Sequence, residues 1–199
     1  ATPLALATDT GTADLASLTL GDGKGAAFDT GILTVNGIET LNIKANAKAG
    51  NADQTSVITS FVADSLTAIN LTGSAVTLSN AATTKAVTID GSALTGTDGS
   101  TPVGLTVAGN LVTGSVVTGS AVGDVFTAGT GFATYNGGAG KDTFNATAAQ
   151  LNTGANYNVI NGGDGEDTLN ITDGAGIAIN IVDNNLSKVS GIEKIVITD

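Results

Sequence analysis

The chain has 199 residues, with 18 Asp or Glu against 7 Lys or Arg, so its formal net charge is −11. It contains no Cys and no His, which excludes the usual nitrogen and sulfur sites for zinc, copper or iron, and also serine–histidine and cysteine–histidine catalysis. Such an acidic chain predicts no nucleic-acid partner, and no apolar run reaches the roughly 18 residues that membrane insertion needs. Carboxylate and carbonyl oxygens remain as metal ligands, and these suit calcium or magnesium.

Residues 1–65 are interpreted as an N-terminal β segment that packs on the rest of the chain. The opening stretch, ATPLALATDTGTADLA, has neither the charged start nor the long apolar run of a signal peptide, and it lacks an initiating Met. We therefore interpret the sequence as an excised part of a larger protein. Near the end of this segment, Val57, Ile58, Phe61 and Val62 have near-helical spacing, which favours a short helix within 51–69.

Residues 66–118 repeat a short apolar alternation that ends in a glycine turn. Gly73, Gly91 and Gly109 lie 18 residues apart. The apolar pairs before them, Ile69/Leu71, Val87/Ile89 and Leu105/Val107, have the same spacing. A fixed period of this kind is typical of a solenoid, in which each coil covers the apolar face of its neighbour. The sequence thus predicts an all-β fold, a parallel β-solenoid with coils of about 18 residues.

Residues 119–170 repeat in nines, and two nines make one coil of 18. The blocks GSAVGDVFT, AGTGFATYN and GGAGKDTFN begin at Gly119, Ala128 and Gly137, and each has an aromatic residue in its eighth position. Seven residues, 146–152, then interrupt the frame, and we interpret them as a surface loop or single helical turn. The frame resumes with TGANYNVIN and GGDGEDTLN.

Residues 171–199 are interpreted as closing strands. They contain VSGIEKIVI (189–197), which resembles VNGIETLNI (35–43) near the other end of the chain. Each copy carries Gly-Ile-Glu followed by an alternating apolar tail. We interpret both as a turn that leads into an outer strand.

The motif GGxGxD can be explained in three ways besides a plain glycine-rich hairpin turn. A phosphate loop needs other glycine spacings and a following helix, and an aspartate would repel the phosphate. An EF-hand needs carboxylates at alternate positions of a 12-residue loop between two helices. The pattern instead matches the calcium-binding nonapeptide GGxGxDxUx, where U is a bulky apolar residue. In it, glycines let carbonyl oxygens converge and the aspartate supplies charge.

The candidate calcium ligands belong to three turns whose aspartates should stack in one column. Asp142 follows Asp124 by 18 residues, and Asp167 follows by 18 plus the seven-residue insertion. The intervening turns carry Ala133 and Asn158 at the aspartate position, so the column should occupy one edge only. About two ions are expected, one between each pair of successive turns. The predicted metal ligands are Gly119, Asp124, Gly137, Gly138, Gly140, Asp142, Gly162, Gly163, Gly165 and Asp167.

The turn at Gly119 is degenerate, because Ser120 and Val122 stand where the other two turns have glycine. A plain turn is therefore a stronger alternative there than in the two complete matches. The ion expected between the turns of Asp124 and Asp142 depends on this incomplete turn.

These blocks, with the upstream glycine-spaced series and VSGIEKIVITD, resemble the RTX (repeats-in-toxin) type of bacterial surface-layer and adhesin proteins. The nonapeptides carry the resemblance over about 119–170. It implies a C-terminal RTX β-roll segment that folds on extracellular calcium. It also implies type I secretion, a place on the bacterial cell surface, and use in a lattice or in adhesion.

The expected function is that of a structural, calcium-stabilised extracellular protein, a surface-layer or other self-assembling component, and not an enzyme. Copies of the chain are the expected partners, in a homo-oligomer, lattice or fibre, with cell-surface polysaccharide as a further candidate. The alternative is an RTX module of a large adhesin, or of a secreted enzyme whose active site lies outside this chain. Ice or polysaccharide binding on a threonine-rich face is disfavoured, because no T-x-T ladder repeats.

Overall fold

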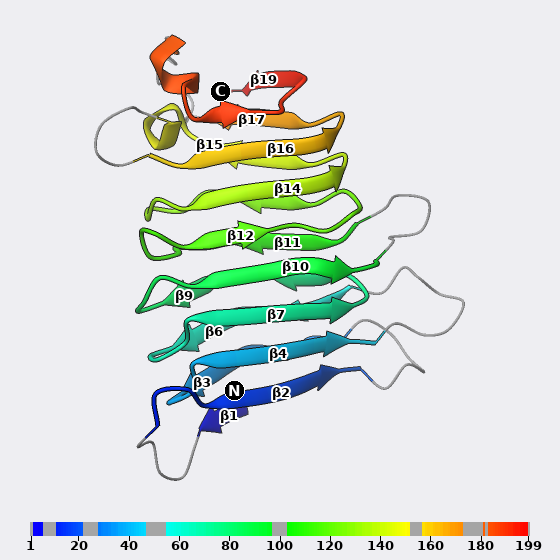
Figure 1. Cartoon of the computed structure of the whole chain (residues 1–199), viewed down its shortest axis with the longest axis vertical. Helices are drawn as coiled ribbons and strands as arrows, with labels where there is room; N and C mark the ends of the chain where they lie inside the picture. Colours follow the sequence, from blue (N-terminus) through cyan, green and yellow to red (C-terminus); the bar gives the residue numbers. More distant parts are fainter. Residues whose placement is uncertain are drawn as a thin grey trace.

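The computed structural model describes residues 2–5, 11–21, 28–46, 55–96, 103–151, 157–172, 181 and 183–198. Its regular elements are β-strands apart from two short 3-10 helices, η1 (Ala148–Leu151) and η2 (Asp183–Leu186). The strands are stacked along the long axis of the molecule, from β1 and β2 at one end to β19 at the other (Figure 1).

The strands form three sheets, in which every pairing between described strands is parallel. The eight-stranded sheet contains β2 (Leu15–Leu20), β4 (Thr40–Ala45), β7 (Ala68–Gly73), β10 (Thr88–Leu94), β12 (Val116–Thr118), β14 (Thr134–Gly140), β16 (Val159–Gly165) and β18 (Val189–Ser190). The seven-stranded sheet contains β5 (Ser56–Ile58), β8 (Val76–Leu78), β11 (Leu105–Ala108), β13 (Val125–Thr127), β15 (Thr143–Ala146), β17 (Thr168–Thr172) and β19 (Lys194–Thr198). The four-stranded sheet contains β1 (Thr2–Ala5), β3 (Ile32–Asn36), β6 (Ser60–Ala63) and β9 (Ala81–Thr83).

Strands of the different sheets alternate along the chain, and we call one such pass a layer. Up to β9, a full layer contributes to all three sheets. From β10 to β19, the described strands alternate between the eight-stranded and seven-stranded sheets. Strand β2 pairs in register with β4, and β4 with β7, so these strands of 1–65 continue the same sheet as 66–118. This all-β architecture with long parallel sheets is compatible with a β-solenoid or β-roll.

The core consists of columns of apolar side chains that stack from layer to layer. In the eight-stranded sheet one column runs through Leu41, Ile69, Ile89, Val117, Tyr135 and Ile160, all 2% exposed or less. In the seven-stranded sheet Phe126 and Phe144 stack with ring centroids 5.2 Å apart, and Leu169 follows them. The eighth positions of the nonapeptides therefore face the core. Parallel pairing in register aligns such columns because every second side chain faces inward.

The predicted period of 18 residues is confirmed only within the nonapeptide segment. Val117 pairs with Tyr135 there, and Phe126 pairs with Phe144. Upstream the prediction is wrong. Ile69 pairs with Ile89, 20 residues on, and Leu105–Ala108 belongs to the other sheet. The turns between strands differ in length, so equal spacing of glycines did not mean equal position in a layer.

The predicted helix within 51–69 is wrong in the part that the structure describes. Strands β5 and β6 lie there, separated by Thr59. Ile58 is buried in the seven-stranded sheet and Phe61 in the four-stranded sheet. The chain turns at Thr59 from one sheet to the next, and the inward-facing residues on both sides of this turn happen to have the spacing of a helix. The insertion at 146–152 contains the single turn η1, as predicted, and Leu151 of that turn is buried.

Candidate metal site

Three aspartates lie in one column at the edge where the chain enters the seven-stranded sheet. Asp124, Asp142 and Asp167 precede β13, β15 and β17, and each side chain is 1% exposed or less. The pairing of these strands in register confirms the column that the sequence predicted. The column lies inside the stack and not on its surface.

Each aspartate in the column binds the backbone of the layer before it. Asp142 Oδ1 accepts a hydrogen bond from the amide of Asp124 at 2.8 Å. Asp167 Oδ1 accepts one from the amide of Asp142 at 2.8 Å. These amides precede their strands and have no partner in the sheet ladder, so the carboxylates satisfy donors that burial would otherwise leave unpaired.

The degenerate turn at Gly119 satisfies its aspartate with protein groups alone. Asp124 Oδ1 accepts a short hydrogen bond from the amide of Leu105. Its Oδ2 accepts one from the amide of Ser120 at 2.6 Å, and the Ser120 hydroxyl lies within hydrogen-bond distance of both oxygens. Ser120 therefore replaces the second glycine of the nonapeptide with an additional donor.

In the two complete turns, one carboxylate oxygen is left without a partner. Asp142 Oδ2 and Asp167 Oδ2 are buried and accept no hydrogen bond. An unpaired buried polar atom costs about 1–3 kcal/mol, and more when it is charged. Both turns therefore contain an acceptor that a proton or a cation would satisfy.

The first glycine of each turn makes room for this carboxylate and for a carbonyl of the next layer. A Cβ on Gly137 would lie 2.1 Å from Asp142 Oδ2 and 2.2 Å from the carbonyl oxygen of Gly162. A Cβ on Gly162 would lie 2.5 Å from Asp167 Oδ2 and 1.7 Å from the carbonyl oxygen of Gly191. Oxygen atoms from two layers thus converge beside each of these glycines.

The remaining predicted glycines allow successive turns to stack closely. Gly138 pairs with Gly163, and Gly140 with Gly165, along the extended ends of β14 and β16. Gly163 has a φ of 105°, and a Cβ there would lie 2.1 Å from the carbonyl oxygen of Gly138. Only glycine tolerates both the left-handed backbone and the short separation between layers.

Burial raises the pKa of all three aspartates. The pKa of Asp124 rises to about 6, mainly through burial, with its hydrogen bonds acting in the opposite direction. The pKa of Asp142 rises to about 7, mainly through burial and further through the charges of Asp124 and Asp167. Burial also raises the pKa of Asp167, with a contribution from Glu193. Stacked carboxyl groups therefore hold protons well above the usual aspartate range unless a positive charge is supplied.

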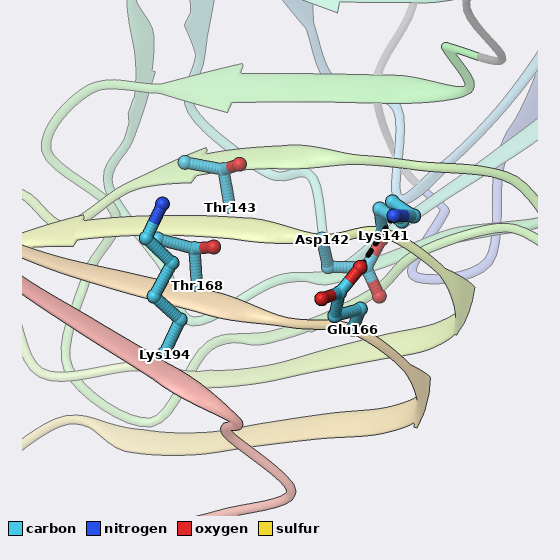
Figure 2. A pocket seen from close by; sticks show the side chains of 6 residues that line it. All are labelled: Lys141, Asp142, Thr143, Glu166, Thr168 and Lys194. Atoms are coloured by element: carbon cyan, nitrogen blue, oxygen red, sulfur yellow. Dashed lines mark hydrogen bonds and ion pairs between the residues drawn. The ribbon is translucent and has the colours of Figure 1, made fainter.

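A shallow depression lies beside the column on the outer face of the seven-stranded sheet. It is lined by Lys141, Asp142, Thr143, Glu166, Thr168 and Lys194. Figure 2 shows Lys141 and Glu166 turned toward one another next to Asp142, with the two threonines and Lys194 on neighbouring strands. Because the Lys141–Glu166 pair is exposed and two lysines line the mouth, the depression has no excess of negative charge to attract a cation.

The sequence did not predict the hydrogen bonds that the glutamates of the two Gly-Ile-Glu motifs accept. Glu193 Oε2 accepts a hydrogen bond from the amide of Asp167 at 2.7 Å and so continues the aspartate column. Glu39 Oε2 accepts one from the amide of Asp14 at 2.8 Å on the edge of the eight-stranded sheet. The repetition of the word at both ends of the chain was the available signal, because each copy places a carboxylate directly before a strand.

The opposite edge of the nonapeptide segment uses neutral groups for the same purpose. Asn158 Oδ1 accepts a hydrogen bond from the amide of Ala133 at 2.9 Å. Ser115 Oγ accepts one from the amide of Val87 at 3.1 Å. Within 119–170 the described aspartate column therefore occupies one edge, as predicted.

Comparison with family models, with curated proteins and with solved structures finds no match. The resemblance to RTX proteins consequently rests on the residues of the repeats alone. No cluster of three or more acidic side chains that could hold a metal ion is found among the described residues. Within the same residues, no helix is long and apolar enough to cross a membrane.

Proposed function

We propose that the chain is a calcium-stabilised extracellular structural protein, a surface-layer or other self-assembling component of the cell surface. In this proposal the layers form a parallel β-solenoid, and residues 119–170 form an RTX-type β-roll. The observation that supports it best is the convergence of Asp142 Oδ2 with the carbonyl oxygen of Gly162 beside Gly137. A cation beside Gly137 would satisfy Asp142 Oδ2, which has no hydrogen-bond partner, and would lie close to the carbonyl oxygen of Gly162.

The donor set fits calcium better than other metals. Calcium accepts carboxylate and backbone carbonyl oxygens in flexible geometry, and these are the groups that converge beside Gly137 and Gly162. Such sites need few carboxylates, which is consistent with the lack of a three-acid cluster among the described side chains. Bound calcium would supply the positive charge that the stacked aspartates lack.

The two complete turns and the degenerate turn should differ in their need for an ion. Asp142 and Asp167 each retain an unpartnered oxygen and would contribute it to calcium. Asp124 has donors on both oxygens, so calcium would have to compete there with Ser120 and Leu105. The turns of Asp142 and Asp167 are therefore the preferred location.

An extracellular setting agrees with this chemistry. Calcium modules of extracellular proteins bind with Kd values of about 10⁻⁴–10⁻³ M, so the ion would be bound outside the cell and absent inside it. At calcium concentrations about 100 times Kd, binding would raise the free energy of unfolding by about 2.7 kcal/mol per site. Such a protein would complete its folding after export.

A structural role fits the acidic residues better than catalysis does. The buried aspartates are hydrogen-bonded to backbone amides that hold adjacent layers together. A catalytic carboxylate must instead reach a substrate. These aspartates lie inside the stack and act on its own backbone.

The test is calcium titration of wild type and of two matched variants, followed by calorimetry and far-UV circular dichroism. Asp167→Asn removes the carboxylate charge inside the column. Asp164→Asn removes the same charge from the same turn at an exposed position. We expect heat of binding and a stability gain for wild type and D164N, and a loss of one site for D167N. Equal titrations for all three proteins would refute the proposed site.

Electron microscopy with calcium and with chelator tests the self-assembly. Ordered sheets or fibres that form with calcium support a surface-layer or fibre component. Monomers under both conditions contradict self-assembly and favour an isolated adhesin module.

A further inference from the structure

The two ends of the strand stack expose apolar side chains that belong to the core columns. Ile195 and Ile197 of β19 pair with Leu169 and Ile171, which are fully buried, yet they are 46% and 56% exposed. At the other end, Leu18 of β2 pairs with the buried Ile43 and is only partly buried, while Leu15, on the outward face of β2, is 60% exposed. Strands β18, β19 and β2 each pair on one side only among the described strands. Free parallel edges with uncovered apolar side chains favour the addition of further strands.

The register of the eight-stranded sheet specifies which residues an added layer would bring together. An outward row of polar side chains passes through every strand of this sheet, from Ser17 of β2 to Ser190 of β18. If β2 of a second copy followed β18 in the same register, Ser17 would lie opposite Ser190 and Ala16 opposite Val189. The row would then continue from one copy into the next.

The same operation brings opposite charges together. In the seven-stranded sheet, Asp29 bridges to Val57, and its row runs through the paired strands to Lys194. Asp29 of the second copy would thus lie opposite Lys194. The same docking position therefore pairs an acid with a lysine in the seven-stranded sheet, although the chain as a whole is strongly acidic.

Asp14 also has an unpaired carboxylate oxygen that a preceding layer would satisfy. Its Oδ2 atom is buried and has no hydrogen-bond partner. In the same column, Glu39 and Asn158 each accept a hydrogen bond from the backbone of the layer before. Asp14 occupies the corresponding position in the first layer, where no earlier described layer supplies a donor.

We infer that a second copy of this chain docks head to tail, with its β2 and residues 28–30 added to β18 and β19 of the first. Such a contact is heterologous, so it repeats and produces a filament along the strand stack. This inference rests on the self-assembly part of the proposed function and does not depend on calcium. It specifies one axial contact out of the many that a surface lattice could use.

Cysteine cross-linking tests the contact directly, because the chain has no Cys of its own. Neighbouring strands lie about 4.7–4.9 Å apart, so the Cα atoms of opposed residues are within the range of a disulfide. Ser17→Cys and Ser190→Cys proteins are mixed under mild oxidation. Ser92→Cys, exposed in the middle of the stack on β10, replaces S190C in the control mixture.

The expected product is a mixed S17C–S190C dimer, and a chain that carries both cysteines should give a ladder of covalent oligomers. The S17C–S92C mixture should give no specific dimer. Mainly S190C–S190C or S17C–S17C dimers would show a two-fold contact between like ends and overturn the inference. Absence of any cross-link, with each variant folded by circular dichroism, would overturn it as well.

A charge variant provides a second readout. Lys194→Glu places an acid opposite Asp29 and should shift sedimentation of the wild-type assembly toward the monomer. Lys85→Glu makes the same charge change at an exposed site away from both ends and should leave the assembly unchanged. An equal response to both variants would reject the register.

The outcomes separate this inference from the proposed function. Calcium-dependent sheets without the S17C–S190C cross-link would leave the proposed function standing and reject the axial contact. The cross-link in a protein that shows no heat of calcium binding would do the reverse.

Discussion

The amide of Asp142 donates a hydrogen bond to Oδ1 of Asp167 at 2.8 Å, although 25 residues separate the two. Asp142 in turn accepts from Asp124, and Glu193 accepts from Asp167. The carboxylates of Asp142 and Asp167 therefore have two functions each. One oxygen holds the backbone of the previous layer, and the other is free to meet a proton or a cation.

Substitutions at Asp142 should separate these two functions. Asp142→Asn keeps an oxygen that can accept from the amide of Asp124 but removes the charge. We expect D142N to equal or exceed wild type in stability in chelator and to lose the calcium-dependent gain. Asp142→Ala removes the acceptor as well and should cost about 1–3 kcal/mol in chelator, and in calcium it should also lose the calcium-dependent gain. Urea denaturation in both conditions measures this, and a D142N protein that is less stable than D142A in chelator would contradict it.

The pH dependence of the calcium-free protein follows from the raised pKa values. The pKa of Asp142 is about 7 and that of Asp124 about 6 in the folded protein, against about 3.9 in an unfolded chain. The folded state therefore holds more protons between pH 4 and 7. Stability from these groups is fully present below about pH 4 and is lost as the pH rises through 6 and 7.

Thermal unfolding in chelator across pH 4–8 should show this decline. Calcium should reduce it, because the ion replaces the proton and binds more tightly as the pH rises through 7. In D142N the decline should be smaller. A stability that increases from pH 4 to 7 in chelator would contradict the raised pKa of Asp142.

The stacking of the glycine turns makes Gly163 more sensitive to substitution than another glycine of similar backbone. Gly163→Ala combines a positive φ with a Cβ 2.1 Å from the carbonyl oxygen of Gly138. Gly31 also has a positive φ, 64°, but no atom lies within 4 Å of the Cβ position. We expect Gly31→Ala to cost about 1–2 kcal/mol and Gly163→Ala clearly more. Equal losses in urea denaturation would mean that layer separation at Gly163 is not limiting.

The aromatic column should contribute more to stability than exposed aromatic side chains. Phe144 is 1% exposed and stacks on Phe126, so Phe144→Ala should cost about 3–5 kcal/mol. Phe28 is 44% exposed, and Phe28→Ala should cost about 1 kcal/mol. The difference is measurable as a shift in the urea midpoint at constant slope. Similar losses would contradict the assignment of Phe144 to the core.

The sequence was most informative where the chain has no freedom in turn length. In 119–170, apart from the insertion at 146–152, the glycine turns have one length, so counting in nines placed Phe126, Phe144 and Leu169 in one buried column. Upstream the turns vary. Ile69 was expected opposite Val87 and lies opposite Ile89. The four-stranded sheet was not predicted either, because its strands are short and their inward residues at corners imitate helical spacing.

The aspartate column could be predicted, but the partners of its side chains could not. Spacing alone placed Asp124, Asp142 and Asp167 one above another. In each aspartate, one oxygen binds the amide of the layer before. This contact depends on the separation and register of the layers, and the sequence of a single repeat does not specify either of them. For the same reason the two Gly-Ile-Glu motifs were interpreted only as turns that lead into strands. In the structure, Glu39 and Glu193 bind the backbone of an adjacent layer.

The in-register stacking of the layers has a mechanical consequence. Paired residues in successive layers are 18 to 31 residues apart, and each strand contacts mainly the strands just before and after it in its sheet. Tension applied to the chain ends would therefore peel layers from an end one at a time, and the length of chain released would differ from layer to layer. Ions bound between Asp142 and Asp167 would fasten neighbouring layers to one another. The extracellular calcium concentration would then set the force that the stack withstands.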